Sequence, residues 1–104
     1  MADRRRSVDQ HRNPFDPLDG TVADTIDLHG LRADEARAAV CAFLQRVQRR
    51  QRGTLVHVIT GKGRRSATGP VLKTVVRTLL RSGSLPVGAW GEDVDGGGYL
   101  IRLT

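Results

Sequence analysis

The chain has 104 residues, of which 38% are hydrophobic and only 4% aromatic, so it suits a single domain with one modest core of aliphatic side chains. Its formal net charge of +6 favours an anionic partner, with nucleic acid the first candidate and an acidic membrane surface the second. The single cysteine, Cys41, excludes an intramolecular disulfide and suits a reducing cytoplasm, and no apolar run is long enough to span a membrane.

Residues 1–23 are predicted to form an N-terminal arm. This segment contains the charge run Arg4-Arg5-Arg6 and a turn-rich stretch without periodicity. One interpretation is a solvated, disordered arm that contributes little to stability. The alternative is a docking arm, in which Phe15 and Leu18 are apolar anchors and the arginines contact phosphates.

The segment from residue 25 to residue 30 is predicted to form a strand that ends at a glycine. Ile26 and Leu28 alternate with polar residues, which is the period-two pattern of a half-buried strand. Because residues i and i+2 point to the same face of a strand, Asp27 and His29 are expected to project together, away from the core. An acid beside an imidazole at the end of a strand is a candidate acid/base pair.

An amphipathic helix is predicted from about Ala33 to Gln51, because apolar residues recur there at helical spacing. The arginines that crowd its end suit the helix dipole, and phosphate binding is the alternative. The apolar run 55–59 is predicted to be a buried strand, parallel to the first strand. His57 lies in the middle of this run, so a structural role is favoured over a catalytic one.

A basic, glycine-containing loop follows this second strand, from residue 60 to residue 66. Its glycines permit close approach to a ligand, and its positive side chains are Lys62, Arg64 and Arg65. The spacing is neither that of a nucleotide-binding P-loop nor that of a dinucleotide-binding turn. The loop is therefore interpreted as a cradle for a phosphodiester backbone, with a simple basic turn as the alternative.

A second amphipathic helix is predicted over residues 71–81, with Pro70 in its first turn, and two strands over residues 86–90 and 99–103. Trp90 and Tyr99 beside the connecting acidic loop could stack on bases or belong to the core. The order is thus β-α-β-α-β-β. Because parallel strands joined by a crossover end at the same edge of a sheet, the acid/base pair and the basic loop are expected to meet there.

Two stretches carry a resemblance to a known family. The first is Asp27-Leu28-His29-Gly30-Leu31, followed by Glu35-Ala36, and the second is Val58-Ile59-Thr60-Gly61-Lys62-Gly63. At this separation they resemble the Smr (small MutS-related) domain family, over roughly residues 24–103. The resemblance implies a two-layer α/β sandwich with a four-stranded mixed sheet of order 1-2-4-3 and two helices on one face. It also implies nucleic-acid binding and, in many members, endonuclease activity on DNA or RNA, including messenger RNA at stalled ribosomes.

The resemblance assigns roles to particular residues. Asp27 and His29 match the catalytic acid-x-histidine pair of the family, and Gly61, Lys62 and Gly63 match its nucleic-acid-binding loop, which Arg64 and Arg65 extend. The third family motif, a Gly-Gly-x-Gly turn, is degenerate, because Val94 and Asp95 replace its leading glycines and only Gly97 matches. Residues 24–104 are expected to be a stand-alone form of the domain.

Two functions remain open from the sequence. In the first, the protein is an endonuclease that nicks or cleaves phosphodiester bonds, with His29 as the general acid or base and Asp27 as its partner. A divalent metal ion at Asp27 is an alternative within this interpretation, although a single carboxylate with no nearby acidic partner makes a poor metal site. In the second, the domain binds nucleic acid or docks on the ribosome without cleavage. The oligomeric state is not predicted.

Overall fold

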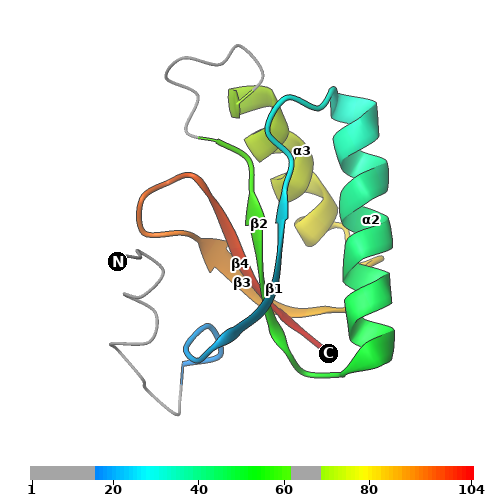
Figure 1. Ribbon diagram of the computed structural model, residues 1–104, viewed down its shortest axis with the longest axis vertical. Coiled ribbons are helices and arrows are strands. Elements are labelled where there is room, and N and C mark those ends of the chain that lie inside the picture. The colour runs from blue at the N-terminus through cyan, green and yellow to red at the C-terminus, as the bar shows by residue number, and fades with distance from the viewer. Residues whose placement is uncertain (1–15, 62–68) are drawn as a thin grey trace.

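The described part of the chain contains the predicted strands and helices in the predicted order (Figure 1). The computed structural model describes residues 16–61 and 69–104. Its elements are β1 (Val22–Asp27), α2 (Ala33–Arg50), β2 (Leu55–Ile59), α3 (Gly69–Arg81), β3 (Val87–Glu92) and β4 (Gly98–Leu103). The first strand begins two residues before the predicted domain boundary and ends before His29.

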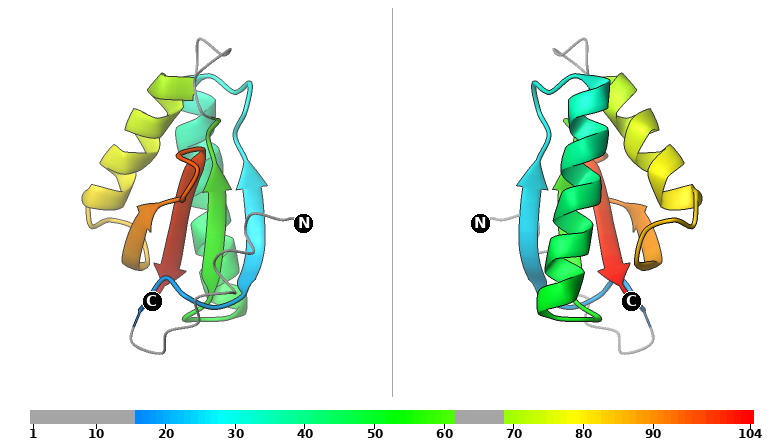
Figure 2. Two further views of the ribbon diagram at one scale, coloured as in Figure 1. Left: turned by 90° about the vertical axis from the view of Figure 1, so that its left-hand side faces the viewer. Right: turned by 90° about the vertical axis from the view of Figure 1, so that its right-hand side faces the viewer.

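The four strands form one mixed sheet of order β1-β2-β4-β3, the order that the resemblance implies. β1 is parallel to β2, whereas β4 is antiparallel to both of its neighbours, β2 and β3. Both helices cover the same face of the sheet, so the protein is a two-layer α/β sandwich (Figure 2). The parallel pair β1 and β2 therefore ends at one edge, as the sequence predicted.

Helix α2 forms where the sequence alternates apolar and polar residues with helical spacing, and its five buried side chains face the sheet. Arg32, the residue before the helix, supplies no side-chain oxygen for the free backbone N–H groups of the first turn. Instead, the Glu35 carboxylate accepts the backbone N–H of Arg32 at 2.9 Å, which is half of a capping box. The acidic first turn also complements the positive end of the helix dipole.

The core lies between the helices and the sheet. Each strand contributes alternate residues to it, because successive side chains of a strand point to opposite faces. Its largest fully buried side chains include Leu28, Phe43, Leu44, Leu72, Tyr99 and Ile101. Tyr99 packs edge-on against Trp90, with ring centroids 5.8 Å apart, and donates its hydroxyl to the carbonyl of Lys73 at 3.1 Å. Tyr99 thus belongs to the core and is not available to stack on a base.

Residues 16–20 of the predicted arm lie on the other face of the sheet. Alternation along β4 places Arg102 on this face, where its guanidinium donates to the carbonyl oxygens of Pro17 (2.9 Å), Asp19 (2.7 Å) and Gly53 (2.9 Å). Leu18 packs so closely over Gly91 that a Cβ added there would lie 2.8 Å from its Cδ1. These contacts favour the docking alternative for residues 16–20, whereas Phe15 and the arginine run lie outside the described residues.

Replacing Arg102 with Ala should lower the free energy of unfolding by about 1–3 kcal/mol, because three carbonyl oxygens lose a charged donor. Chemical denaturation of the purified protein would measure the change. Arg37→Ala is the matched control, since Arg37 is exposed and makes no ion pair with any described residue. Equal stability of the two variants would show that residues 16–20 are not held by this guanidinium.

Candidate nucleic-acid interface

Asp27 is the last residue of β1, and its side chain fixes the turn that follows. Its Oδ1 accepts the backbone N–H of His29 at 2.9 Å, which is the hydrogen bond of an Asx turn. The next turn is closed by the N–H of Leu31, which donates to the carbonyl of Leu28 at 3.0 Å, and Gly30 has a φ of +86°. Asp27 therefore has a local folding role that the strand pattern did not predict.

His29 lies in this turn and is exposed. Because β1 ends at Asp27, the alternation that would place the two side chains on one face does not reach His29. Asp27 contacts the backbone of His29, and among residues 16–61 and 69–104 no hydrogen bond or ion pair includes its imidazole. Both ring nitrogens are thus free, within the described chain, to contact a ligand.

The end of β2 lies at the same edge. Asp27 pairs with Ile59, and the N–H of Leu28 donates to the Ile59 carbonyl at 2.8 Å. His29 and Gly61 each follow this Asp27–Ile59 pair by two residues, so the first two motifs converge as predicted. The rest of the predicted cradle, Lys62, Gly63, Arg64 and Arg65, lies outside the described residues.

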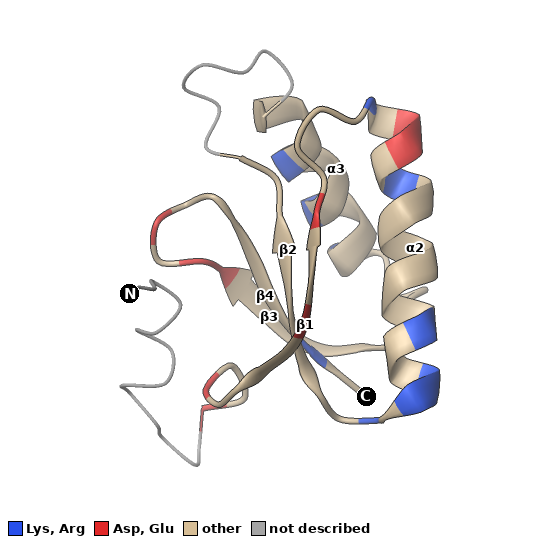
Figure 3. Ribbon diagram, viewed as in Figure 1, with Lys and Arg blue, Asp and Glu red and all other residues tan. Residues whose placement is uncertain are grey.

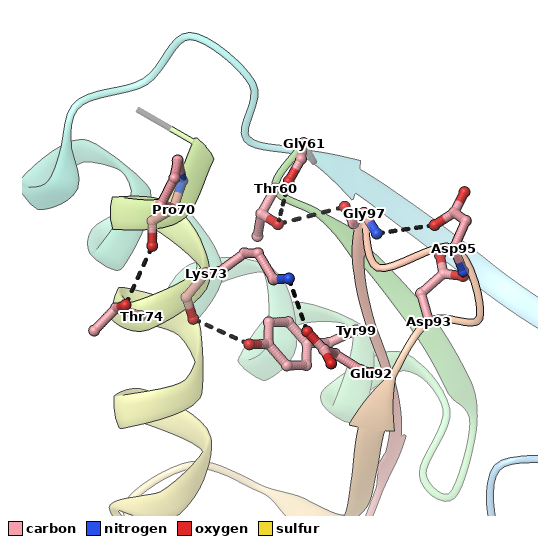
Figure 4. Close-up of polar contacts among 10 residues, drawn as sticks. All are labelled: Thr60, Gly61, Pro70, Lys73, Thr74, Glu92, Asp93, Asp95, Gly97 and Tyr99. Atoms are coloured by element: carbon pink, nitrogen blue, oxygen red, sulfur yellow. Dashed lines mark hydrogen bonds and ion pairs between the residues drawn. The ribbon is translucent and has the colours of Figure 1, made fainter. Parts of the chain in front are cut away.

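The third motif meets the second through one carbonyl group. The Gly97 carbonyl accepts the N–H of Thr60 at 2.9 Å and that of Gly61 at 3.1 Å, and the Thr60 hydroxyl is 3.4 Å from it (Figure 4). Gly61 has a φ of +91°, a conformation that L side chains rarely adopt. The amides of Thr60 and Gly61 are therefore occupied within the protein rather than directed at a ligand.

Gly97 itself is buried, and the acidic turn uses its other backbone group. The Asp95 carboxylate accepts the Gly97 N–H at 2.9 Å (Figure 4). The sequence placed Gly97 among the nucleic-acid-binding residues, and that role stays a prediction. Its buried backbone supports the edge through hydrogen bonds within the protein. Gly98, which the sequence analysis did not single out, is required sterically, because a Cβ there would collide with the Val58 carbonyl of β2.

A second acid–histidine pair lies on the helix-free face of the sheet. The Nε2 of His57 is 2.6 Å from Oδ2 of Asp93, and the two side chains are 8% and 14% exposed. The sequence predicted a structural histidine in the middle of β2 but did not identify its partner. Thirty-six residues separate the pair along the chain, and only the register of β4 against its two neighbours brings them together.

The charges around this edge are partly neutralised. The hydrogen bond from His57, assisted by the backbone N–H of Asp95, lowers the pKa of Asp93, although burial opposes the change. Lys73 on α3 forms an ion pair with Glu92 at 2.8 Å, and this contact lowers the pKa of Glu92 (Figure 4). Within the described ranges, no three His, Cys, Asp or Glu side chains gather closely enough to hold a metal ion.

Exposed arginines gather at the other end of the molecule, at the C-terminal end of α2 (Figure 3). This α2 arginine cluster consists of Arg46, Arg49, Arg50 and Arg52. Only Arg50 pairs with an acid in the described chain, at 3.6 Å from Asp24, and Arg46 lies over the Phe43 ring. No helix in the described part of the chain is long and apolar enough to cross a membrane.

The strand order and the two helices on one face define a two-layer α/β domain whose three glycine-containing turns meet at one edge. The Smr domain family matches residues 26–98, and the chain belongs to this family. Smr domains are in general nucleic-acid-binding modules, and the family is associated with endonuclease activity. No curated protein matches the chain.

A solved structure supports the fold. The crystal structure of the Smr domain of Thermus thermophilus MutS2 is similar to this chain with a TM-score of 0.63 and 23% sequence identity. The similarity covers 78% of this chain and 96% of that one. At this level of identity the likeness establishes the arrangement of strands and helices rather than a shared activity.

The lowered pKa of Asp93 predicts how its contribution to stability depends on pH. A carboxyl whose pKa is lower in the folded state stabilises the fold fully above its ordinary value of 3.8, and this contribution disappears as the pH falls through the folded value. Asp93→Asn should therefore be less stable than the unsubstituted protein at pH 5, and the difference should shrink toward pH 2.5. Urea denaturation across this range measures both. A constant difference would contradict the ion pair.

Proposed function

We propose that the protein is an endonuclease that cleaves phosphodiester bonds of DNA or RNA at the edge where β1 and β2 end. The observation that carries the proposal is the position of His29: it is exposed, its imidazole has no partner in the described chain, and it follows the end of β1 as Gly61 follows the end of the paired strand β2. A general acid or base needs such a free nitrogen within reach of the substrate. We expect the protein to act in the cytoplasm.

His29 would move a proton during cleavage. The neutral imidazole would accept the proton of the attacking group, which is water in hydrolysis or an RNA hydroxyl in transesterification. The protonated ring would donate a proton to the oxygen that leaves the phosphorus atom. Asp27 would support the first step in two ways, because its carboxylate fixes the backbone of His29 and its negative charge would stabilise the imidazolium that forms when the ring accepts a proton. Lys62, followed by Arg64 and Arg65, would offset the charge that develops on the phosphate. A divalent ion at Asp27 would need ligands from the nucleic acid or water.

The alternative function is a nucleic-acid-binding or ribosome-binding module without cleavage. The observation that favours it is the use of Asp27, Gly61 and Gly97 in hydrogen bonds within the protein. In this alternative, the motif residues build a basic docking edge and His29 is a surface contact. Multiple turnover of labelled DNA and RNA by the purified protein distinguishes the two functions.

The catalytic proposal predicts that His29→Ala cleaves at least ~10²-fold more slowly, with nearly unchanged affinity and melting temperature, because an exposed imidazole contributes chemistry rather than packing. Rates under single-turnover conditions, affinities by anisotropy and melting curves would test this. Full activity in the folded variant would exclude His29 as the acid or base.

Asp27→Asn separates the two roles of the carboxylate. An amide oxygen can still accept the N–H of His29, so the turn and the melting temperature should be preserved. The rate should nevertheless fall, because an amide cannot stabilise an imidazolium. Asp27→Ala removes the hydrogen-bond acceptor as well, so it should lower both the cleavage rate and the melting temperature. An undiminished cleavage rate in Asp27→Asn would show that Asp27 only stabilises the turn and has no role in catalysis.

Phosphate contacts should make the affinity depend on salt. Replacing Lys62, Arg64 and Arg65 with Ala should flatten the slope of log K against log salt by about two to three units, since each lost phosphate contact contributes about 0.7–0.9. The triple variant Arg46→Ala, Arg49→Ala, Arg52→Ala removes the same charge from the α2 arginine cluster and is the matched control. A flatter slope only in the control would move the interface to that end of α2.

A further inference from the structure

The His57–Asp93 pair joins two elements that the backbone ladder does not join at this point. His57 lies in the middle of β2, and Asp93 follows the end of β3, which is separated from β2 by β4. The imidazole and carboxylate meet at 2.6 Å on the face that the helices leave free. Nε2 can donate to the carboxylate whether the ring is neutral or charged, in the tautomer that carries its proton there.

The surroundings of His57 give it no other charged partner in the described chain. Its neighbours in the sheet are Thr25 on β1 and Leu100 on β4. The other charged groups on this face have partners of their own. Arg102 donates to three carbonyl groups. The carboxylates there accept backbone N–H groups, namely those of Asp16, Asp19, Asp27 and Asp95. The pair is therefore specific to these two residues.

Asp93 also organises the turn between β3 and β4. Its N–H donates to the Gly98 carbonyl at 2.9 Å, and its own carbonyl accepts the N–H of Gly96 at 3.0 Å. Its second carboxylate oxygen lies 3.3 Å from the N–H of Asp95, whose carboxylate in turn accepts the N–H of Gly97. Anchoring Asp93 consequently anchors the whole turn, including the Gly97 carbonyl.

That carbonyl ends the chain of contacts at the edge. It accepts the N–H groups of Thr60 and Gly61, where the chain leaves β2 toward Lys62. The contacts thus leave β2 at His57, pass through Asp93 and the turn, and return to the chain at Thr60, directly after the end of β2. They bracket the last residues of β2 and fix the direction in which the chain departs.

We propose that His57 and Asp93 are positioning residues for the nucleic-acid interface, acting through the Gly97 carbonyl on Thr60 and Gly61 without touching the nucleic acid. This inference rests on the proposed function of the edge. If the backbone of Thr60 and Gly61 is fixed before the nucleic acid binds, less conformational entropy is lost on binding, and the affinity is higher. Sheet pairing alone does not require the pair, since the β2–β4 ladder already joins five residue pairs, and a buried ion pair adds little to stability over apolar packing.

The test combines amide hydrogen exchange with nucleic-acid affinity. In His57→Leu and in Asp93→Asn, the amides of Thr60 and Gly61 should exchange at least about tenfold faster, because opening of the turn no longer breaks a charged contact. Affinity for fluorescently labelled single-stranded RNA and duplex DNA should fall about three- to tenfold. Glu92→Gln is the control, since it removes the neighbouring Glu92–Lys73 ion pair on the opposite face and should change neither quantity.

The outcomes separate this inference from the proposed function. Unchanged exchange at Thr60 and Gly61 in a folded variant would overturn the positioning role, as would faster exchange with undiminished affinity. If His57→Leu fails to fold, Asp93→Asn carries the same test, because Asp93 lies in a turn. If the unsubstituted protein binds neither RNA nor DNA, the proposed function fails and the role of the pair in binding fails with it, while the exchange measurement still reports on the contact itself.

Discussion

The central position of β2 is the constraint on which the site depends. β2 pairs in parallel with β1 on one side and antiparallel with β4 on the other. Its carboxyl end therefore meets both the end of β1 and the turn that precedes β4. The crossover through α2 joins β1 and β2 as parallel neighbours, and the absence of a side chain at Gly98 permits β4 to approach β2 closely on its other side.

Backbone hydrogen bonds at this edge are largely satisfied within the protein. The amides of Thr60, Gly61 and Gly97 all have partners there, and so does the amide of His29. Buried polar groups need such partners, because an unpaired N–H away from water is costly. Among the side chains at this edge in the described chain, the imidazole of His29 has no partner and can contact a ligand.

Charge is distributed unevenly over the molecule. The acidic turn between β3 and β4 lies beside the proposed interface, yet Lys73 offsets the charge of Glu92 and His57 bonds the carboxylate of Asp93. The net charge of +6 can attract nucleic acid from a distance. Local contacts then determine which basic side chains bind the phosphates. If the basic loop is the interface, replacing its three basic residues changes the salt dependence of the affinity, whereas replacing those of the α2 arginine cluster does not.

The sequence by itself determined the elements and the edge at which they meet. Helical and strand periodicity are local properties, so α2 and β2 could be located from their own residues, and two motifs after parallel strands indicated a common edge. The same reasoning overextended β1, because the pattern of alternation continues through His29 while the carboxylate of Asp27 turns the chain.

Only the tertiary structure decided which residues are partners. The register of β4 between β2 and β3 brings Asp93 to His57, buries Gly97 and places Tyr99 in the core. These relations join residues that are far apart in the chain, and no local pattern encodes them. A one-residue change of register would reverse the face of every side chain on β4, which is the physical reason that pairing, and not composition, settled these roles.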